Sequence, residues 1–407
     1  MSTSKAKVKI CFVTTVPYQI QMFLGTHILA LLPHAEIIVV TNGDDREICG
    51  LSPLWTDRVR VCNVHFRRPI RPLHDFCALL QLVNILRRER PDIVQSMSPK
   101  AGLLCALAGW LVKIPIRVHW FTGQVWVTRQ GLMRSVLKCC DTLISRFSTN
   151  LLADSASQRN FLIDHDVAHR SKIEVLGSGS VCGVNTDRFH PNPASRSTVR
   201  RLYDIPDDAV LALFVGRITP DKGVLDFAQA LLKLSDSDVT IHAMFVGPDE
   251  GHLTEAIRLT SKRSFQRVVI TGYSDSPESF MAAADFLVLP SYREGFGSTI
   301  IEAAACGIPA IGSRICGIVD AIDEGETGLL VQPRNAGQLA EAMHVLAIDR
   351  DFRVTLGLAA RARALLHFRT GQLNIALINY FDQLLRRSGR TGLLSDSATH
   401  QVFVSKA

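Results

Sequence analysis

The 407-residue sequence is poor in aromatic side chains and has no long apolar run. Phe, Trp and Tyr together make up 7% of the residues, and the longest uncharged apolar stretch, Ala101 to Val112, is about twelve residues. A membrane-spanning helix needs roughly 20. The basic start of the chain reaches Thr-Thr-Val-Pro too soon to hold the apolar core of a signal peptide. We therefore expect a cytoplasmic protein that touches a membrane at most from one side.

Patterns for disulfides and zinc sites are also missing. The ten cysteines include no Cys-x-x-Cys pair, and none combines with histidines at the spacing of a zinc site. Cys11, Cys62 and Cys105 lie within apolar runs. This distribution is typical of free, buried thiols in a reducing compartment. It predicts neither a disulfide framework nor a metal centre.

The charge excess is too small to single out a partner. The formal net charge is +7, from 45 Lys and Arg against 38 Asp and Glu. An anionic small substrate, an anionic membrane or nucleic acid could account for it, and so could a solvated basic face. Apolar residues make up 47% of the chain, which is typical of a globular protein with a sizeable core.

Val- and Ile-rich runs alternate with amphipathic stretches along most of the chain. This alternation is typical of βαβ units, and runs without polar residues indicate strands that are covered on both faces. The expected strands are Val8–Thr15, Glu36–Thr41, Val59–Phe66, Asp92–Ser98, Arg117–Phe121, Asn150–Asp154, Lys172–Leu176, Val210–Val215, Val239–Val246, Val268–Thr271, Phe286–Leu289, Pro309–Gly312 and Gly328–Val331. Helices are expected at Leu73–Arg88, Lys100–Val112 and Leu132–Phe147, and again from Ala336 to Arg387.

A stretch rich in Gly, Ser, Pro and Asn, residues 177–198, divides the two halves and predicts a linker. The fold class predicted is therefore α/β, with two tandem Rossmann-like, doubly wound parallel sheets that face each other across a cleft. We place an N-terminal domain at residues 1–190 and a C-terminal domain at 191–370. A helix at 371–387 is expected to pack back on the N-terminal domain, before a weakly ordered polar tail at 388–407.

One stretch, residues 291–313, combines a glycine loop, a helix start and two carboxylates. The loop at 294–297 reads Glu-Gly-Phe-Gly, and the next helix opens at Ser-Thr. Glycines allow close approach of a ligand, and the unpaired amides of a helix start attract an anion. Glu302 in that helix has two oxygens for the hydroxyls of a ribose, and Glu294 could serve a sugar ring in the same way. Acidic residues also favour helix starts, so a structural role stays open for each glutamate.

Further polar groups follow the ends of other expected strands. Arg217 and Lys222 stand five positions apart in FVGRITPDKG and suit two neighbouring phosphates, with a solvated basic pair as the alternative. The turn at 271–273, Thr-Gly-Tyr, could present backbone groups to a nucleobase. His119 lies near a strand end in VHWFTGQVW. A single histidine is more often structural than catalytic, but a rim position facing the second domain favours function.

These segments resemble glycosyltransferase family 4, whose members are retaining enzymes with two Rossmann-like domains in the GT-B fold. The likeness rests on GRITPDKG, TGY, PSYREGFGSTIIEAAACGIPAIGS and ETGLLV. VHWFTGQVW, SPKAG and LGSGSVCGVNTDRF are similar to a bacterial branch that builds polysaccharides or lipid-linked oligosaccharides. The usual Gly-Gly turn after the first strand is replaced by Thr14-Thr15-Val16-Pro17-Tyr18, and the usual Gly-Val-Asp reads Gly183-Val184-Asn185.

The resemblance implies a role for each matching residue. Glu294 would hold the donor sugar and support charge near the anomeric carbon, and His119 would lie beside the transferred sugar, so these two are the expected catalytic residues. The residues expected at the nucleotide and its diphosphate are Arg217, Lys222, Gly272, Tyr273, Ser298, Thr299 and Glu302. Those expected at the donor sugar are Gly295, Phe296 and Gly297. No metal and no cofactor are expected, because two cations and a helix start can stabilise a leaving diphosphate.

The predicted function is transfer of a hexosyl or N-acetylhexosaminyl group, with retention, from a nucleoside diphosphate, UDP rather than GDP. The acceptor would be a hydroxyl of a glycan or of a polyprenyl-diphosphate-linked saccharide in bacterial capsule or lipopolysaccharide synthesis. No carboxylate is evident as a covalent nucleophile, which favours front-face attack. A UDP-sugar epimerase of the same fold and a non-catalytic sugar-nucleotide-binding protein stay open as alternatives.

Basic residues beside apolar ones in the first half suggest an anionic membrane surface as a further partner. They form three groups: Arg67, Arg68 and Arg71; Arg87, Arg88 and Arg90; and Arg129, Arg134 and Lys138 beside Trp120, Phe121, Trp126, Leu132 and Met133. They would suit a peripheral position on the inner face of the plasma membrane. Ordinary solvated faces and core aromatics are the alternative, and no nucleic acid partner is expected.

Overall fold

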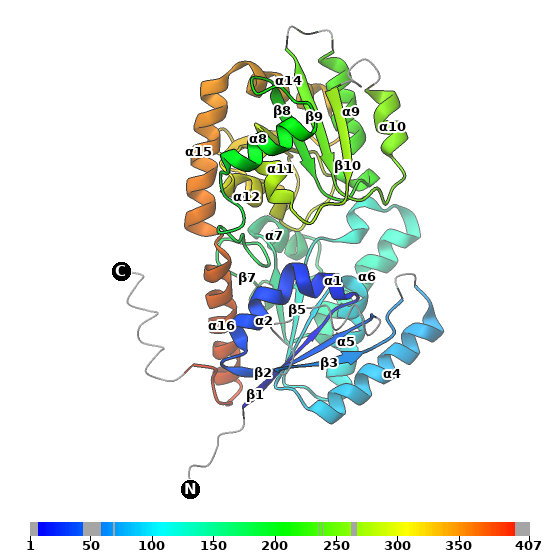
Figure 1. Ribbon diagram of the computed structural model, residues 1–407. Helices are drawn as coiled ribbons and strands as arrows, with labels where there is room; N and C mark the ends of the chain where they lie inside the picture. Colours follow the sequence, from blue (N-terminus) through cyan, green and yellow to red (C-terminus); the bar gives the residue numbers. More distant parts are fainter. Residues whose placement is uncertain are drawn as a thin grey trace.

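The computed structural model contains two parallel β-sheets, one of seven strands and one of six. Each sheet forms the centre of one domain, and the two domains lie one above the other (Figure 1). The structure describes residues 7–43, 58–67, 70–235, 237, 239–261 and 267–394. These two sheets confirm the predicted α/β fold class. Every predicted strand is present with bounds that differ by at most three residues.

The N-terminal sheet has the order β3-β2-β1-β4-β5-β6-β7. Its strands are β1 (Val8–Val13), β2 (Ala35–Thr41), β3 (Val59–Asn63), β4 (Ile93–Met97), β5 (Ile116–Phe121), β6 (Asn150–Ala153) and β7 (Ile173–Val175). The helices are α1 (Pro17–Gln19), a π-helix at Ile20–Leu24, α2 (Gly25–Leu31), α4 (Pro72–Glu89), α5 (Pro99–Leu111), α6 (Gly131–Phe147) and α7 (Ala156–Asp164). The strand order reverses beside β1, so this sheet has a switch point at which ligands commonly bind.

The C-terminal sheet has the order β10-β9-β8-β11-β12-β13. Its strands are β8 (Val210–Val215), β9 (Ile241–Val246), β10 (Val268–Gly272), β11 (Phe286–Leu289), β12 (Ala310–Ser313) and β13 (Gly328–Val331). Its helices are α8 (Pro193–Leu202), α9 (Val224–Lys233), α10 (Thr254–Thr260), α11 (Pro277–Ala283), α12 (Ser298–Ala305), α13 (Ile318–Ala321), α14 (Ala336–Ile348) and α15 (Arg350–His367), and α16 (Thr370–Arg387) follows.

Strand β1 shows why its residues from Ile10 to Val13 are all apolar. Successive side chains of a strand point to opposite faces. Phe12 packs on one face with Phe381 of α16, at 6.5 Å between ring centroids, whereas Cys11 and Val13 pack on the other face with residues such as Leu82 of α4. Both faces of the strand are therefore covered by helices, and neither tolerates a polar side chain.

The chain crosses between the two domains at two adjacent segments. Val184 donates its amide to Phe368 O at 2.7 Å, and Thr370 donates to Val184 O at 3.0 Å. Helices α15 and α16 lie on either side of this crossing, one beside each sheet (Figure 1). The crossing holds the two sheets together along one side of the molecule.

Two segments differ from the sequence prediction. Residues 192–198 belong to α8 rather than to the linker, because the Asn192 side chain accepts the Ser195 amide as an N-cap and Pro193 occupies the first turn. Residues 388–394 are ordered rather than loose: Leu393 is buried against the core that contains α16, and Arg390 pairs with Asp92. Residues 395–407 of the predicted tail lie outside the described residues.

No helix within the described ranges is both long and apolar enough to cross a membrane. No disulfide joins the described cysteines, of which Cys11, Cys105 and Cys306 are buried.

Candidate functional site

A cleft of about 1350 Å³ lies between the two domains. Its walls come from segments that directly follow strands of both sheets, including Val16–Tyr18 after β1, Asn42 after β2, Arg217 after β8 and Tyr273 after β10. The carboxyl ends of parallel strands are the edge at which α/β sheets bind ligands. The volume exceeds that of an ordinary small-molecule pocket, so it has room for two substrates.

The start of α12 forms one wall of the cleft. Ser298 and Thr299 line it, and the residue before them, Gly297, has φ +73° and leaves the helix without a side-chain cap. The first amides of a helix need partners from outside the helix. A phosphate or another anion in the cleft would supply them.

Glu302 lies one turn further along α12 and also lines the cleft. Burial raises the pKa of its carboxyl to about 7, with Arg188 opposing and Glu278 adding to the rise. Near neutral pH the side chain therefore exchanges between its acid form and its carboxylate. The carboxylate can accept a hydroxyl hydrogen bond at each of its two oxygens, whereas the acid form carries an O–H donor on one of them.

The two cations predicted at the diphosphate are both paired with carboxylates. Arg217 lines the cleft, and its Nη1 lies 2.9 Å from Glu250 Oε2. Lys222 Nζ lies 2.5 Å from Glu294 Oε1, and the same oxygen accepts a hydrogen bond from Ser291 Oγ at 2.8 Å. The structure therefore brings Lys222 and Glu294 together, although neither is part of the cleft wall.

The predicted nucleobase turn lies at the cleft. Gly272 ends β10 with φ +77°, and its carbonyl accepts the Gly247 amide at 2.8 Å. Tyr273 lines the cleft, is 61% exposed and donates its hydroxyl to Asp275 at 2.6 Å. A ring at this position is accessible to a planar ligand.

The glycine loop at 294–297 packs against the N-terminal domain. A Cβ on Gly295 would collide with Asp154 Oδ2 and would lie 2.8 Å from the carbonyl carbon of Thr122. A Cβ on Gly123 would lie 3.1 Å from the Gly295 nitrogen. Phe296 is 2% exposed, and its ring lies 5.3 Å from that of Phe368. These contacts require glycine at position 295 whether or not a sugar approaches it.

The prediction that His119 faces the second domain is wrong. Its side chain is 2% exposed, and Nδ1 lies 2.8 Å from Ser96 Oγ. A Cβ on Gly102 of α5 would collide with the ring, so the imidazole points down into the helices that cover the sheet. Burial lowers its pKa to about 3. His119 lies two residues before the end of β5, and the residues that meet the glycine loop are Thr122 and Gly123.

Sequence reasoning missed Asp154 and Tyr18. Asp154 follows β6 and contacts the glycine loop, and a polar residue directly after a strand was the signal for it. Tyr18 stands in place of the expected Gly-Gly turn, lines the cleft and is 53% exposed. Burial and then Glu302 raise the pKa of Tyr18, whereas Arg217 opposes the rise. The phenol is therefore within electrostatic reach of the predicted nucleotide-binding residues.

A second contact between the domains lies at the start of α7, the helix at the junction of the two domains (Figure 1). The Asp320 carboxylate of α13 accepts the Ser157 amide at 3.2 and 3.3 Å and also pairs with Ser157 Oγ. The negative charge lies where the helix dipole favours it. The contact joins the first turn of α7 to the C-terminal domain.

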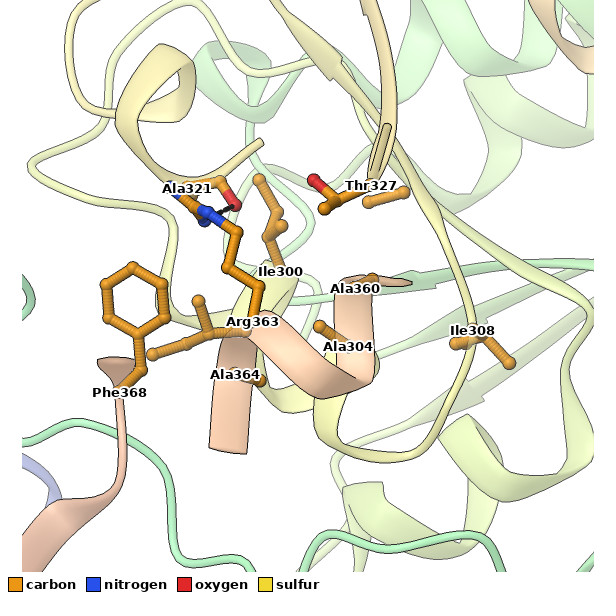
Figure 2. A pocket seen from close by; sticks show the side chains of 11 residues that line it. Ile300, Ala304, Ile308, Ala321, Thr327, Ala360, Arg363, Ala364 and Phe368 are labelled. Atoms are coloured by element: carbon orange, nitrogen blue, oxygen red, sulfur yellow. Dashed lines mark hydrogen bonds between the residues drawn. The ribbon is translucent and has the colours of Figure 1, made fainter. Parts of the chain in front are cut away.

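A small cavity lies beside α13, the helix that carries Asp320. Arg363 donates to Asp320 O at 2.8 Å and to Ala321 O at 2.9 Å, and its guanidinium lies 5.0 Å from the centre of the Phe368 ring (Figure 2). The cavity has a volume of about 10 Å³, which is room for about one water molecule. It is a packing gap rather than a ligand site. Within the described residues, no three His, Cys, Asp or Glu side chains gather closely enough to hold a metal ion.

Two family models match the chain. Residues 195–363 match Glycosyl transferases group 1, and residues 28–179 match Glycosyl transferase 4-like domain. The chain is 29% identical over 302 residues to the capsular polysaccharide biosynthesis glycosyltransferase CapM of Staphylococcus aureus. The aligned region covers 74% of this chain and 79% of that protein. It is 24% identical over 363 residues to the UDP-Gal:alpha-D-GlcNAc-diphosphoundecaprenol alpha-1,3-galactosyltransferase of Escherichia coli. Here the aligned region covers 87% of this chain and 92% of that protein.

A solved structure shares the arrangement of both domains. Anabaena Alr3699/HepE in complex with UDP superposes with a TM-score of 0.72 at 19% identity, over 92% of this chain and 99% of that one. At this identity the likeness shows the fold alone, which is the predicted GT-B arrangement.

Proposed function

We propose that this chain, a glycosyltransferase by its two matched domains, moves a hexosyl or N-acetylhexosaminyl group from a UDP-sugar to a lipid-linked or glycan acceptor in bacterial surface polysaccharide synthesis. The observation that carries the proposal is the cleft, where Glu302, Arg217 and the start of α12 come together. The UDP donor is supported by the named E. coli relative and by the UDP complex of the Anabaena protein. Both domain matches favour transfer over epimerisation.

Each group at the cleft has a part in holding the donor. Glu302 accepts the ribose hydroxyls as a carboxylate, and the turn at Tyr273 holds the base. The diphosphate lies at Arg217 and the start of α12, which together offset its charge. Lys222 leaves Glu294 for the diphosphate when the donor binds, and this frees Glu294 for hydroxyls of the sugar. The charges of the diphosphate and of Glu294 then both lie within reach of the anomeric carbon.

Transfer proceeds on one face of the sugar, with retention. The bond from the anomeric carbon to the phosphate oxygen breaks, and the acceptor oxygen forms the new bond on the same side. The departing phosphate oxygen takes the proton of the acceptor hydroxyl. Arg217, Lys222 and the helix start stabilise the leaving diphosphate, so the proposal needs no metal ion. Closure of the cleft excludes water, which would otherwise hydrolyse the donor.

The N-terminal domain receives the acceptor and lies on an anionic membrane surface. Two sets of exposed apolar side chains lie on it: Leu73, Phe76 and Leu80 on α4, and Leu132, Met133 and Val136 on α6. Arg67 and Arg71 line the cleft beside the start of α4, and Arg129, Arg134 and Lys138 accompany the set on α6. Basic and apolar side chains together suit an anionic lipid surface.

Not all residues of the predicted membrane-facing groups are available to a membrane in the structure. Trp120, Phe121 and Trp126 are at most 3% exposed, so these aromatics belong to the core. Arg88 at the far end of α4 pairs with Glu89. Arg68 lies outside the described residues.

The function is tested by product analysis. The protein is incubated with UDP- and GDP-sugars chosen by a thermal-shift screen, together with a polyprenyl-diphosphate-linked saccharide, and products are identified by mass spectrometry and NMR. A longer lipid-linked glycan with a retained anomeric configuration is expected. Epimerised nucleotide sugar, or binding without turnover for every donor and acceptor offered, would reject the proposal.

Membrane contact is tested separately with vesicles. Co-sedimentation with anionic vesicles is expected to fall when Leu132 and Met133 are replaced by Ser. The control is Leu358→Ser, which removes a 64% exposed leucine from α15 of the C-terminal domain. Equal binding of all variants, or no binding to anionic or neutral vesicles, would remove the membrane part of the proposal.

A further inference from the structure

The carboxyl group of Asp154 is enclosed where the two domains meet. Asp154 directly follows β6 and is 4% exposed. Its backbone is fixed on both sides, because its amide donates to Gln158 Oε1 at 2.7 Å and its carbonyl accepts the Ser180 amide at 2.7 Å. Oδ2 packs against Gly295 so closely that a Cβ at that position would collide with it. The side chain is thus held against the backbone of the glycine loop.

One oxygen of the enclosed carboxyl, Oδ1, has no hydrogen-bond partner among the described residues. Neither has Trp120 Nε1, which lies near the same carboxyl. Burial is the main cause that raises the pKa of Asp154 well above its usual range; Trp120 opposes the rise and Glu294 adds to it. A charged carboxylate with an unpaired oxygen is costly in such a place, so the acid form is favoured.

Three titratable groups face Asp154 from the elements around it. They are Glu294 in the glycine loop, Cys182 in the segment after β7 and Cys316 before α13. Burial raises the pKa of Cys182 to about 12 and that of Cys316 to about 11, so both thiols stay neutral in the range in which enzymes are assayed. Glu294 is the carboxyl group of these three; it is the residue next to Gly295 and is paired with Lys222.

We propose that Asp154 is a positioning residue for sugar transfer: the N-terminal domain uses this side chain to set the glycine loop, so that Glu294 stands at the donor sugar only while the two domains are docked. This inference rests on the proposed function. Lys222 and Ser291 hold the Glu294 carboxylate from its own domain. The backbone of the loop at Gly295 has two further supports, Asp154 and the backbone of Thr122 and Gly123. Neither support comes from the domain that carries the loop.

The proposal separates donor binding from turnover. Arg217, Glu302 and Tyr273 line the cleft and Asp154 does not, so the affinity for UDP is expected not to depend on this side chain. The rate of transfer does, because displacement of a catalytic group by about 1 Å can cost roughly a hundredfold.

The proposal also gives turnover a pH dependence. An acid with a raised pKa favours the docked arrangement while it is protonated. Docking is therefore lost as pH rises through the pKa of the docked state. Above that pH, a buried Asp154 carboxylate would lie against the glycine loop beside the Lys222–Glu294 pair, and the cost of burying this charge would disfavour the docked arrangement.

The test compares Asp154→Asn, Asp154→Ala and a matched control, Asp141→Asn. Asp141 is also buried in the N-terminal domain, has a pKa raised by burial to about 6 and accepts a hydrogen bond from Trp126 Nε1 at 2.8 Å. Four quantities are measured for each variant: kcat and donor KM from about pH 6 to 9.5, the UDP-induced rise in Tm, and hydrogen exchange of residues 291–299.

Asp154→Ala is expected to lower kcat at least about tenfold, with the UDP-induced Tm rise unchanged and faster exchange at 291–299. Asp154→Asn keeps the shape and cannot ionise, so it should keep most of kcat and lose the alkaline fall that the unaltered protein shows. Asp141→Asn should match the unaltered protein in everything but overall Tm.

Unchanged kcat and exchange in Asp154→Ala would overturn the inference. So would an alkaline fall that persists in Asp154→Asn, which folds with the least disturbance, or equal effects in the Asp141 control. If the unaltered protein transfers no sugar while Asp154→Ala still speeds exchange at 291–299, the proposed function fails and the contact of Asp154 with the loop stands.

Discussion

Replacement of Glu302 by Gln is expected to stabilise the fold above neutral pH and to weaken nucleotide binding. Burial is the main cause that raises the pKa of Glu302 from 4.5 to about 7. An acid with a raised pKa holds its proton more tightly in the folded than in the unfolded state. The free energy of unfolding therefore falls as pH rises from 4.5 to about 7, and the whole loss is present above that range.

The size of this loss follows from the pKa. A rise from 4.5 to about 7 is about 2.5 units, and each unit corresponds to ~1.4 kcal/mol. The carboxyl borders an open cleft, so water screens part of the penalty, and we expect ~1–3 kcal/mol. Glutamine has the same shape without the charge and avoids this cost. Glu302→Gln should gain that amount at about pH 8 and much less at about pH 5.

Urea denaturation at the two pH values measures the gain. Titration with UDP between about pH 6 and 8 measures the effect of the same charge on nucleotide binding, because the carboxylate accepts one ribose hydroxyl at each oxygen and the acid form has an O–H donor on one of them. As pH rises towards 7, the affinity of the unaltered protein for UDP should increase by up to about tenfold per pH unit, and above pH 7 it should level off. In Glu302→Gln it should be weaker and independent of pH. A variant less stable than the unaltered protein at pH 8, or one that binds UDP equally well, would refute the reasoning.

Lys222→Ala and Glu294→Ala should each abolish most transfer while the fold survives. Each removes a proposed donor contact and leaves a partner that is at most 17% exposed without its counter-charge. Initial rates beside circular dichroism check this, and near-normal rates in both would contradict the assignment. Asp320→Ala removes the carboxylate at the start of α7 and should cost ~1–3 kcal/mol of stability and loosen the domains. Small-angle scattering should then show a larger radius of gyration. Identical scattering curves and stability would show that this contact does not hold the two domains together. Gly123→Ala puts a methyl group 3.1 Å from the loop backbone at φ +95° and should lower kcat with UDP binding intact. Gly131→Ala, at φ +60° with no atom within 4 Å, controls for backbone strain, and equal kcat in the two would argue against the loop contact.

The strands could be located from the sequence most exactly where they are apolar throughout and covered on both faces, as in β8 and β11. β8, β11 and β13 begin and end at the predicted residues. The predicted linker ran too far, since Asn192 and Pro193 look like loop residues in isolation but cap α8 in the structure. The same residue types serve both purposes, so composition alone does not separate them.

The positions of Arg217 and Glu302 at the cleft were predictable, and that of His119 was not. Arg217 and Glu302 follow strand ends that share one edge of a sheet, which the strand pattern already implies. His119 failed because a residue inside a strand that is covered on both faces points into a helix layer, whereas the residues after the strand, Thr122 and Gly123, reach the second domain. The predicted strand, Arg117–Phe121, ends at the same residue as β5, so the strand end itself was predictable.

By itself the sequence determined two parallel sheets in tandem, the order of their strands along the chain, and one loop that combines glycines with a carboxylate. These are local properties, set by apolar runs and turn residues that are close in the chain. Only the tertiary structure decided that Asp154 and Thr122 support this loop, that Lys222 pairs with Glu294, and that Ser157 meets Asp320 from 163 residues away. Contacts of that length depend on how two finished domains dock at Val184 and Thr370. No periodicity within either domain encodes that docking.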